Sequence, residues 1–450
     1  MNCPRVLMAG TSSGSGKTTA VCAILSLMKR RGIDVKALKC GPDYLDPTFH
    51  QTVTGVPCTN LDPFFCDEDL LKYLLCENAG ERLTVIEGVM GFYDGTGPSG
   101  TDNSTYTVAK RTKTPTVLVI DAAGASTSLV AVLEGFLNYR SDSGIVGVLF
   151  SRISPMNYQN IKNIINAGFG AKVTPVGHIP NLPDDCLIPS RHLGLVSAPE
   201  IADISEKMAK IADICEKTID IDALVSLADA AGELSFTAPD IPRHKPIKIA
   251  VAYDRAFFFY YSDTLTMLKK MGAEICYFSP LENEPIPSDC SGLMIGGGYP
   301  ELYAERLEAN TVTKNSIFEA IRSGMPTVAE CGGFEFLGNE LCGKKMCGVL
   351  PHGSFAAGKL VRFGYVTLTA KKDGLLGPAG TTLRGHEFHY YDSTDNGDAF
   401  TATKPSGKTW DCAVMTDTMY AGYPHLYFYS NIEAAEAFYK KCVEYGERKK

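Results

Sequence analysis

The chain has 450 residues, of which 45% are hydrophobic and 21% are charged, and its formal net charge at pH 7 is −8. Because this length exceeds what a single hydrophobic core usually supports, we expect two or three domains. The mild acidic balance and the scattered basic residues exclude a continuous basic surface, so we expect neither nucleic acid nor a membrane as a partner.

Cysteine usage and hydropathy indicate the compartment. The 15 cysteines are an odd number and contain no C-x-x-C pair, which predicts reduced, buried thiols in the cytoplasm rather than disulfides or structural zinc. No apolar run reaches the length that crosses a bilayer, and the first residues lack the charged start and cleavage site of a signal peptide. We therefore expect a soluble, cytoplasmic protein.

The first half alternates short β-branched runs with stretches of helical period. The runs occupy residues 5–9, 35–39, 84–87, 115–120 and 144–150. Buried parallel strands have this apolar character, and helices connect them. We predict an α/β domain with a mostly parallel sheet over residues 1–197.

The same alternation starts again after a proline-rich stretch. Residues 198–231 have a helical period and residues 237–246 contain three prolines, so we assign residues 198–245 to a helical segment and linker. New strand-like runs follow at residues 246–252, 274–278, 292–296 and 326–330. They predict a second α/β domain over residues 246–450.

A phosphate-binding loop directly follows the first run. Residues 10–19 read Gly-Thr-Ser-Ser-Gly-Ser-Gly-Lys-Thr-Thr and open a helical stretch. Glycines let the backbone wrap a phosphate chain, Lys17 supplies positive charge, and the Thr18 hydroxyl is suited to bind Mg²⁺. The leading glycine is one residue farther from the lysine than in the usual P-loop. The residues predicted to bind the nucleotide are Gly10, Thr11, Gly14, Gly16, Lys17, Thr18 and Thr19.

Acidic residues follow the second and third runs. Asp43 and Asp46 come after the second run, Glu87 ends the third, and Asp94 follows it. Ligands in open α/β sheets bind beyond the carboxyl ends of the strands, where these side chains would join the phosphate loop. Taken singly, each acid is more commonly a loop carboxylate or a helix cap. Beside Thr18, however, Glu87 is the favoured Mg²⁺ ligand and Asp46 is the next candidate.

One cysteine in the second half has the setting of a nucleophile. Cys331 lies in the segment Ala-Glu-Cys-Gly-Gly-Phe, where a strand-like run ends and two glycines follow. Such a strand-to-helix turn presents the sulfur above the sheet, and a helix N-terminus favours the thiolate. The remaining cysteines have no comparable setting and are expected to fill the core.

Two further features would complete a nucleophilic site. The turn Gly-Gly-Gly-Tyr-Pro-Glu follows the preceding run, and the N–H groups of Gly297 and Gly298 could form an oxyanion hole. Without the cysteine, an ordinary glycine-rich turn would be an equally good interpretation. The general base is expected to be a histidine, and His425 lies on a late strand-like run. His386 and His389 are rivals that spacing alone leaves open.

Taken together, these motifs resemble the cobyrinate a,c-diamide synthase family, whose members amidate the corrin ring in cobalamin biosynthesis. The resemblance extends over essentially the whole chain. Besides the phosphate loop, it rests on residues 40–47, 87–95, 189–195, 296–301, 330–333 and 385–390 and on the run that contains His425. Several of these segments would be weak singly, but their order and spacing together are specific.

The resemblance implies a P-loop, dethiobiotin-synthetase-like parallel-sheet domain followed by a class I glutamine amidotransferase-like α/β domain. It implies ATP and Mg²⁺ as cofactors, glutamine and a corrinoid tetrapyrrole as substrates, and a homodimer as the assembly to consider. By similarity, Cys331 is the nucleophile and His425 raises its reactivity. The residues expected to shape the corrinoid and metal side of the synthetase site are Asp43, Leu45, Asp46, Glu87 and Asp94.

Two departures from related enzymes are visible. Triad amidotransferases carry a glutamate two residues after the catalytic histidine, but here the run is His425-Leu-Tyr427, which leaves open what orients the histidine. Many related synthetases have an asparagine near Ser151 that reads the nucleotide base, whereas residues 150–152 here are Phe-Ser-Arg. The sequence therefore specifies phosphate binding better than the choice of base.

The expected reaction is ATP-dependent amidation of the a- and c-acetates of cobyrinate through an acyl phosphate, with glutamine or ammonia as nitrogen donor. One alternative is a,c-diamidation of Ni-sirohydrochlorin in coenzyme F430 biosynthesis, because the motifs do not separate tetrapyrroles that share these acetates. An alternative from another class is a P-loop ATPase switch of the partitioning type. That alternative explains the phosphate loop but not Cys331 or His425.

Overall fold

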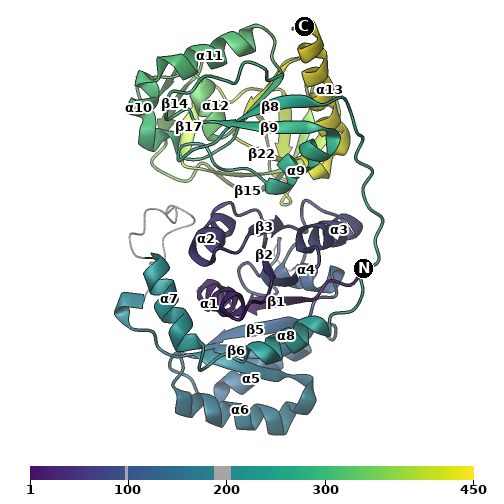
Figure 1. Ribbon diagram of the computed structural model, residues 1–450, viewed down its shortest axis with the longest axis vertical. Helices are drawn as coiled ribbons and strands as arrows, with labels where there is room; N and C mark the ends of the chain where they lie inside the picture. Colours follow the sequence, from purple (N-terminus) through teal and green to yellow (C-terminus); the bar gives the residue numbers. More distant parts are fainter. Residues whose placement is uncertain (97–99, 187–203, 450) are drawn as a thin grey trace. The chain divides into compact units, whose positions relative to one another are not determined.

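The computed structural model describes residues 1–96, 100–186 and 204–449, and the chain forms two compact units, Met1–Pro239 and Asp240–Lys450 (Figure 1). Residues 189–195, one of the segments that carry the family resemblance, lie outside the described residues. Each unit is built around its own hydrophobic core and its own principal sheet. The predicted α/β class is therefore confirmed for both halves.

The first unit contains a seven-stranded sheet in the order β3-β2-β4-β1-β5-β6-β7, and every neighbouring pair is parallel. Its strands are β1 (Arg5–Gly10), β2 (Val35–Cys40), β3 (Cys58–Leu61), β4 (Leu83–Glu87), β5 (Thr116–Asp121), β6 (Ile145–Ser151) and β7 (Thr174–Ile179). The five predicted strands are the central ones. The two strands that the sequence analysis missed, β3 and β7, form the edges of the sheet. Their apolar signal is weak because β3 has only four residues, two of them polar, and β7 contains proline, glycine and histidine.

Helices connect these strands, as parallel pairing requires. They are α1 (Lys17–Arg30), α2 (Leu45–Thr54), α3 (Glu68–Ala79), α4 (Thr105–Arg111), α5 (Ser128–Tyr139), α6 (Pro155–Phe169), α7 (Ile204–Cys215) and α8 (Ile221–Asp229), with short 3₁₀ turns at Gly170–Lys172 and Asp184–Cys186. Buried residues of α1, α7 and α8 share one core with the sheet. The helical segment that we set apart as residues 198–245 thus contributes two helices to the first unit.

The second unit has a principal sheet in the order β20-β21-β11-β10-β8-β9. Its strands are β8 (Ile247–Ala252), β9 (Ala273–Phe278), β10 (Gly292–Ile295), β11 (Thr327–Glu330), β20 (Val414–Met415) and β21 (Met419–Gly422). All pairs are parallel except β20 with β21. The helices around it are α9 (Ser262–Met271), α10 (Ala304–Ala309), α11 (Thr311–Arg322), α12 (Gly332–Leu337) and α13 (Ile432–Arg448), with 3₁₀ turns at Pro300–Tyr303 and Phe428–Ser430.

Two smaller sheets complete the second unit. A five-stranded antiparallel sheet contains β15 (Arg362–Ala370), β16 (Thr382–His389), β18 (Phe400–Thr403), β19 (Thr409–Cys412) and β22 (His425–Tyr427). A four-stranded sheet contains β12 (Glu340–Leu341), β13 (Lys344–Lys345), β14 (Gly353–Ala356) and β17 (Tyr391–Ser393). β22 directly follows β21 in the chain, so it places His425 close to the carboxyl end of the principal sheet.

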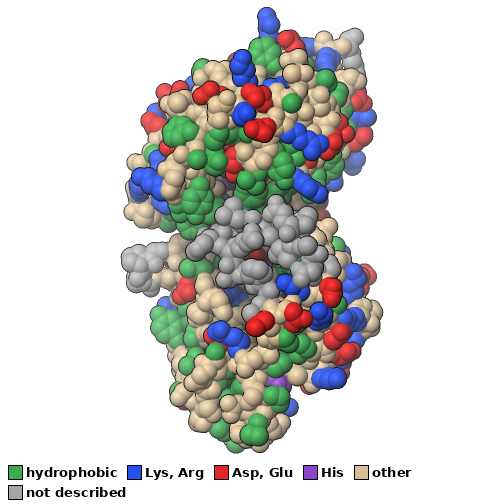
Figure 2. All heavy atoms as spheres, turned by 90° about the vertical axis from the view of Figure 1, so that its left-hand side faces the viewer, with side chains coloured by type: hydrophobic (Ala, Val, Ile, Leu, Met, Phe, Trp, Pro, Cys, Tyr) green, Lys and Arg blue, Asp and Glu red, His purple; other side chains and the backbone are tan. Residues whose placement is uncertain are grey.

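The 15 cysteines are all free, and only Cys276 and Cys342 are not buried. Within residues 1–96, 100–186 and 204–449, no helix is long and apolar enough to span a membrane. On the face drawn in Figure 2, basic and acidic side chains are interspersed on both units. The mixture agrees with the scattered charges of the sequence.

Candidate active sites

The phosphate loop of the first unit joins β1 to α1. Gly16 precedes α1 with φ of 90°, a conformation that glycine adopts without strain. A Cβ atom on Gly10 would lie 2.3 Å from the Ser15 hydroxyl and 2.8 Å from Lys17 Nζ. Lys17 Nζ donates hydrogen bonds to the carbonyls of Ser12 (3.0 Å) and Met90 (2.7 Å). The lysine therefore lies across the loop, close to where a phosphate chain would be neutralised.

Ser151, near which related synthetases are expected to carry a base-reading asparagine, contacts the phosphate loop in this chain. The Ser151 hydroxyl donates to the carbonyl of Ser15 at 2.7 Å, and a Cβ atom on Gly16 would lie 3.1 Å from Ser151 Cβ. Arg152 has a positive φ of 58° and its Nε donates to Asp121 Oδ1 at 2.8 Å. Ser151 thus supports the phosphate loop, and no base-reading role follows from its contacts.

A buried ionic network lies beside the loop. Glu87 Oε1 accepts hydrogen bonds from Thr18 Oγ1 (2.7 Å) and Lys39 Nζ (2.8 Å), and its other oxygen contacts His50 Nε2. Lys39 also pairs with Asp46 Oδ2 at 2.5 Å. Lys39 and Glu87 are register partners on β2 and β4, which brings their side chains to the same end of the sheet. The structure thus brings together Thr18, Asp46 and Glu87, the three predicted metal ligands.

The pKa directions within this network describe three mutually stabilised charges. Burial alone would raise the pKa of Glu87, but Lys39 and His50 hold it far below its usual range. Burial alone would lower the pKa of Lys39, yet Asp46 and Glu87 raise it well above its ordinary value. His50 is fully buried, and despite that burial its contacts with Cys22 and Glu87 raise its pKa. The carboxylate therefore stays ionised although its side chain is only 1% exposed.

Sequence reasoning missed Lys39 and His50. The available signal for Lys39 was a lysine at the carboxyl end of a strand whose residues are all buried, where a charge requires a partner. No local signal marks His50, because its partner Glu87 is distant in the sequence and adjacent only in the fold. Their contacts show that the carboxylate of Glu87 already has cationic partners in the protein itself.

The donors near the loop suit Mg²⁺ in part. Thr18 Oγ1 and Glu87 Oε1 are adjacent oxygens of the kind that Mg²⁺ prefers, and phosphate and water oxygens usually supply the remaining ligands. The Asp46 carboxylate instead faces Lys39. Among the described residues, no group of three His, Cys, Asp or Glu side chains is arranged to hold a metal ion. Thr18 and Glu87 remain the better metal-ligand predictions, and Asp46 remains the weaker one.

The other predicted substrate residues organise loops at the same edge. Asp43 Oδ1 accepts the backbone N–H groups of Leu45 (2.8 Å) and Asp46 (3.3 Å) and so starts α2. Burial and the nearby Asp46 carboxylate raise the pKa of Asp43 to about 6. Asp94 Oδ2 accepts the N–H group of Gly91 at 2.8 Å, in the loop whose Met90 carbonyl binds Lys17. These side chains have structural contacts, and their contact with substrate stays a prediction.

A hollow of 700 Å³ in the first unit adjoins Asp94. Aromatic rings line part of it: Tyr93 packs on Phe136 with 5.6 Å between ring centroids and on Tyr139 with 4.9 Å. The Tyr93 hydroxyl donates to the Phe136 carbonyl, which fixes the ring against α5. The hollow therefore combines apolar rings with one carboxylate beside the phosphate loop.

In the second unit, Cys331 occupies a sharp turn between β11 and α12. Its φ of 50° is unusual for a residue with a side chain, and its N–H group donates to the carbonyl of Gly422 at 2.8 Å. A Cβ atom on Gly332 would lie 2.8 Å from Pro300, and one on Gly333 would lie 2.1 Å from a backbone oxygen. The two glycines are therefore required for the turn that presents the sulfur.

Gly297 brings the nucleophile and the base together. A Cβ atom on Gly297 would lie 2.4 Å from His425 Cε1, 3.1 Å from His425 Nε2 and 3.3 Å from Cys331 Cβ. Both side chains therefore border the small volume that the glycine leaves free. Gly298 has φ of 156°, and a Cβ atom there would lie 2.1 Å from the Ala256 carbonyl. The geometry gathers Cys331, His425 and the predicted oxyanion turn into one site.

The expectation of a thiolate is wrong for the ligand-free protein. Burial raises the pKa of Cys331 well above its usual value. The α12 helix that follows has only six residues, too short for a strong dipole to offset this effect. Because the pKa of this thiol is raised, a neighbouring base has to accept its proton before the sulfur can act as a nucleophile.

The two rival histidines have other contacts. His386 on β16 is the register partner of His425, and burial lowers the pKa of His386 to about 3. His389 Nδ1 lies 2.6 Å from the Tyr391 carbonyl, and its ring stacks on Tyr423 with 3.9 Å between centroids. These contacts favour His425 as the base.

Comparison with known proteins supports these two sites. Residues 6–196 match the family model of the CobQ/CobB/MinD/ParA nucleotide binding domain, and residues 248–432 match that of the CobB/CobQ-like glutamine amidotransferase domain. A cobyrinate a,c-diamide synthase of Listeria monocytogenes is 37% identical, with 95% of this chain and 97% of the relative covered. The chain belongs to the cobyrinate a,c-diamide synthase family.

Two further relatives agree with this assignment. The enzymes of the same name from Thermoplasma volcanium and Thermoplasma acidophilum are 36% and 38% identical; they cover 100% and 97% of this chain, and each alignment includes 99% of the relative. The chain is thus a glutamine-dependent, amide-forming ligase with a nucleotide-binding half. A P-loop switch is not favoured, because it leaves the amidotransferase half without a role.

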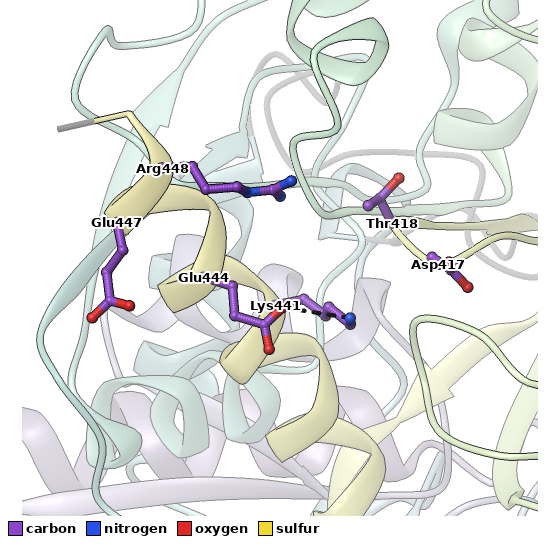
Figure 3. Close-up of a pocket in the computed structure, with 6 residues that line it drawn as sticks. All are labelled: Asp417, Thr418, Lys441, Glu444, Glu447 and Arg448. Atoms are coloured by element: carbon purple, nitrogen blue, oxygen red, sulfur yellow. Dashed lines mark ion pairs between the residues drawn. The ribbon is translucent and has the colours of Figure 1, made fainter.

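A second hollow, of 590 Å³, lies on the second unit beside α13 (Figure 3). Side chains of both signs line it, and Lys441 pairs with Glu444 at 3.4 Å. Its residue Thr418 precedes β21, whereas Cys331 follows the other end of the parallel strand β11. This hollow therefore lies at the opposite edge of the sheet from Cys331 and contains none of the predicted site residues.

The ionic network predicts a large stability effect at Lys39. In a Lys39→Met variant the buried carboxylate of Glu87 loses its ammonium partner, so we expect the unfolding free energy of the first unit to fall by about 3–5 kcal/mol. Hydrogen exchange at β2 and β4, measured by mass spectrometry, would report it. Lys110→Met, which removes an exposed pair with Asp142, is the matched control and should leave exchange nearly unchanged. Equal exchange in both variants would contradict the assignment.

The phosphate loop predicts a pH dependence of nucleotide binding. Burial and the charge of Lys39 lower the pKa of Lys17 to about 8, so this lysine is charged at pH 7 and loses its proton as the pH rises. Phosphate binding favours the charged form, and the Kd for ATP should therefore rise by up to about tenfold per pH unit above about pH 8. Calorimetric titrations between pH 7 and 9.5 would measure it. Lys17→Met should bind weakly with no such slope, and a flat profile for the unmodified protein would refute the role.

Proposed function

We propose that this chain uses ATP and glutamine to convert the a- and c-acetate carboxylates of cobyrinate into amides, in cobalamin biosynthesis. The observation that carries the proposal is the near-full-length similarity to relatives named cobyrinate a,c-diamide synthase. The two sites supply the chemistry that this name requires. One is suited to phosphate transfer, and the other combines a buried cysteine with a histidine.

The first unit would activate the carboxylate. A carboxylate oxygen attacks the γ-phosphorus of ATP, the bond to the bridging oxygen breaks, and ADP leaves the acyl phosphate behind. Lys17 neutralises charge on the phosphates, and Thr18 and Glu87 would hold Mg²⁺, which supplies additional positive charge to the phosphate oxygens. Ammonia then attacks the acyl carbon and displaces phosphate. The aromatic hollow beside Asp94 is the place we assign to the apolar edge of the macrocycle.

The second unit would release ammonia from glutamine. Cys331 Sγ attacks the side-chain amide carbon while its proton passes to His425 Nε2, and the N–H groups of Gly297 and Gly298 face the developing oxyanion. Collapse of the intermediate breaks the C–N bond, and Nε2 returns the proton to the leaving nitrogen. Ammonia leaves, and water then hydrolyses the thioester to glutamate and the free thiol. The high pKa of Cys331 makes this transfer to the base necessary.

We place the reaction in the cytoplasm, where the 15 free thiols would stay reduced. The homodimer considered from the sequence is kept as part of the proposal. Ammonia has to reach the acyl phosphate unprotonated, because ammonium has no free electron pair for the attack. A protected transfer from the second unit to the first is therefore expected.

The macrocycle is the part of the proposal that a direct assay decides. Purified protein would be incubated with ATP, Mg²⁺ and glutamine, and separately with cobyrinate, hydrogenobyrinate or Ni-sirohydrochlorin, and the products analysed by mass spectrometry. We expect cobyrinate to gain two amides. Amidation of Ni-sirohydrochlorin alone would replace the proposed substrate, and no amidation of any tetrapyrrole would refute the function.

The division of labour predicts the behaviour of a Cys331→Ser variant. A serine hydroxyl is a far weaker nucleophile than the cysteine sulfur, so glutamine-dependent amidation should fall by at least about 100-fold. Amidation supported by a high concentration of ammonium should stay within twofold, because it needs only the first unit. Initial rates with each nitrogen donor would be compared in one preparation. Equal loss with both donors would contradict the assignment of Cys331.

A further inference from the structure

The carboxylate of Glu330 occupies the side of His425 that faces away from the nucleophile. Glu330 ends β11, immediately before Cys331, and its side chain is 10% exposed. Its Oε2 lies 3.6 Å from His425 Nδ1, and its Oε1 accepts the backbone N–H of Leu426 at 3.0 Å. The opposite ring nitrogen, Nε2, borders the free volume of Gly297 together with Cys331. The imidazole ring thus has the Glu330 carboxylate near Nδ1, and its Nε2 borders the same free volume as Cys331.

We propose that Glu330 is the positioning residue of the glutaminase site and replaces the glutamate that is absent two residues after His425. The proposal rests on the proposed function of the second unit. An ionised carboxylate at Nδ1 selects the tautomer that carries its proton there, which leaves Nε2 with the lone pair needed to accept the proton of Cys331. The thiol proton moves to Nε2, and the positive charge that results lies beside Glu330. The carboxylate itself takes no proton.

Other carboxylates near the site do not have this geometry. Glu335 and Glu301 lie near Cys331, and burial raises the pKa of both carboxyls, that of Glu301 to about 7. Glu387 is buried on β16, and its Oε2 lies 3.8 Å from His389 Nε2. Glu330, in contrast, contacts the ring of His425 and accepts the N–H of Leu426, the residue that follows His425 on β22. It is thus placed to stabilise the imidazolium of His425.

Backbone contacts hold both Glu330 and the segment that carries His425 in place. Glu330 is the register partner of Gly422 on β21, and the N–H group of Cys331 donates to the Gly422 carbonyl. Three residues later the chain reaches His425, whose neighbour Leu426 donates to Glu330. Nucleophile, base and carboxylate are therefore tied together by one short connection between β21 and β22. The separation of 3.6 Å suits a contact that tightens when the ring becomes charged.

The test is a Glu330→Gln variant. Glutamine keeps an acceptor for the Leu426 N–H and has nearly the same shape, so it removes the charge while conserving the structural contact. We expect kcat for glutamine hydrolysis to fall by at least about 10-fold with KM within twofold, because the effect is on proton transfer and not on binding. Amidation supported by ammonium should be unchanged. Glu330→Asp, which keeps the charge at a greater distance, should recover part of the lost kcat.

Glu387→Gln is the matched control, because it removes another buried carboxylate of the same unit without removing a contact to His425 Nδ1. Its kcat should stay within threefold of the unmodified protein. The single tryptophan, Trp410, lies in β19 of the second unit, so its fluorescence during urea unfolding reports whether each variant is folded. If Glu330→Gln fails to fold, kcat and KM for glutamine hydrolysis are compared between Glu330→Asp and the unmodified protein instead.

A double variant shows whether Glu330 acts by positioning His425 or independently of it. If Glu330 acts through His425, the Glu330→Gln change should cause no further loss in a His425→Ala background. An additive loss would overturn the proposal, as would an unchanged kcat or a rise in KM alone for Glu330→Gln. Retention of glutamine hydrolysis by Cys331→Ser or His425→Ala would instead refute the proposed function, so the two failures are distinguishable.

Discussion

Both sites depend on the way parallel strands end at a common edge. In the first unit, β1, β2 and β4 are neighbours, so the phosphate loop, Lys39 and Glu87 meet although they are far apart in the chain. In the second unit, β10 and β11 end beside each other, so the glycine turn after one meets Cys331 after the other. Parallel pairing thus converts residues that merely follow strands into residues of one site.

The two edges use buried charge in opposite ways. At the first, Lys39 and His50 contact Glu87, and the pKa of its carboxyl is held below the usual range. Lys17, which donates to two backbone carbonyls of the neighbouring loops, is the cation placed to meet anionic phosphates. At the second, burial raises the pKa values of Cys331 and of the neighbouring Glu335 carboxyl, which favours their neutral forms. A base is therefore needed to remove the thiol proton before the sulfur can attack a substrate.

Local motifs were the part of the sites that the sequence could predict. The phosphate loop and the Cys331 turn are each contained in a short run of consecutive residues, and Gly10, Gly332 and Gly333 have steric reasons to be glycine. The central strands were predictable from their apolar character, whereas the edge strands β3 and β7 were not. Lys39 and His50 act through a partner in another strand or helix, so no spacing rule could find them. The thiolate expectation failed because burial is a tertiary property.

The free volume at Gly297 explains why the elements of the second site are not independent. A methyl group there would overlap the ring of His425 and press on Cys331, so the oxyanion turn, the base and the nucleophile must keep one mutual arrangement. Glu330 precedes the nucleophile and binds the backbone beyond the base, which means that a shift of β22 would change both the ring and its carboxylate together. A carboxylate on the nucleophile strand therefore couples the orientation of the base to the position of the sulfur. A glutamate two residues after the histidine would follow β22 alone and could not provide that coupling.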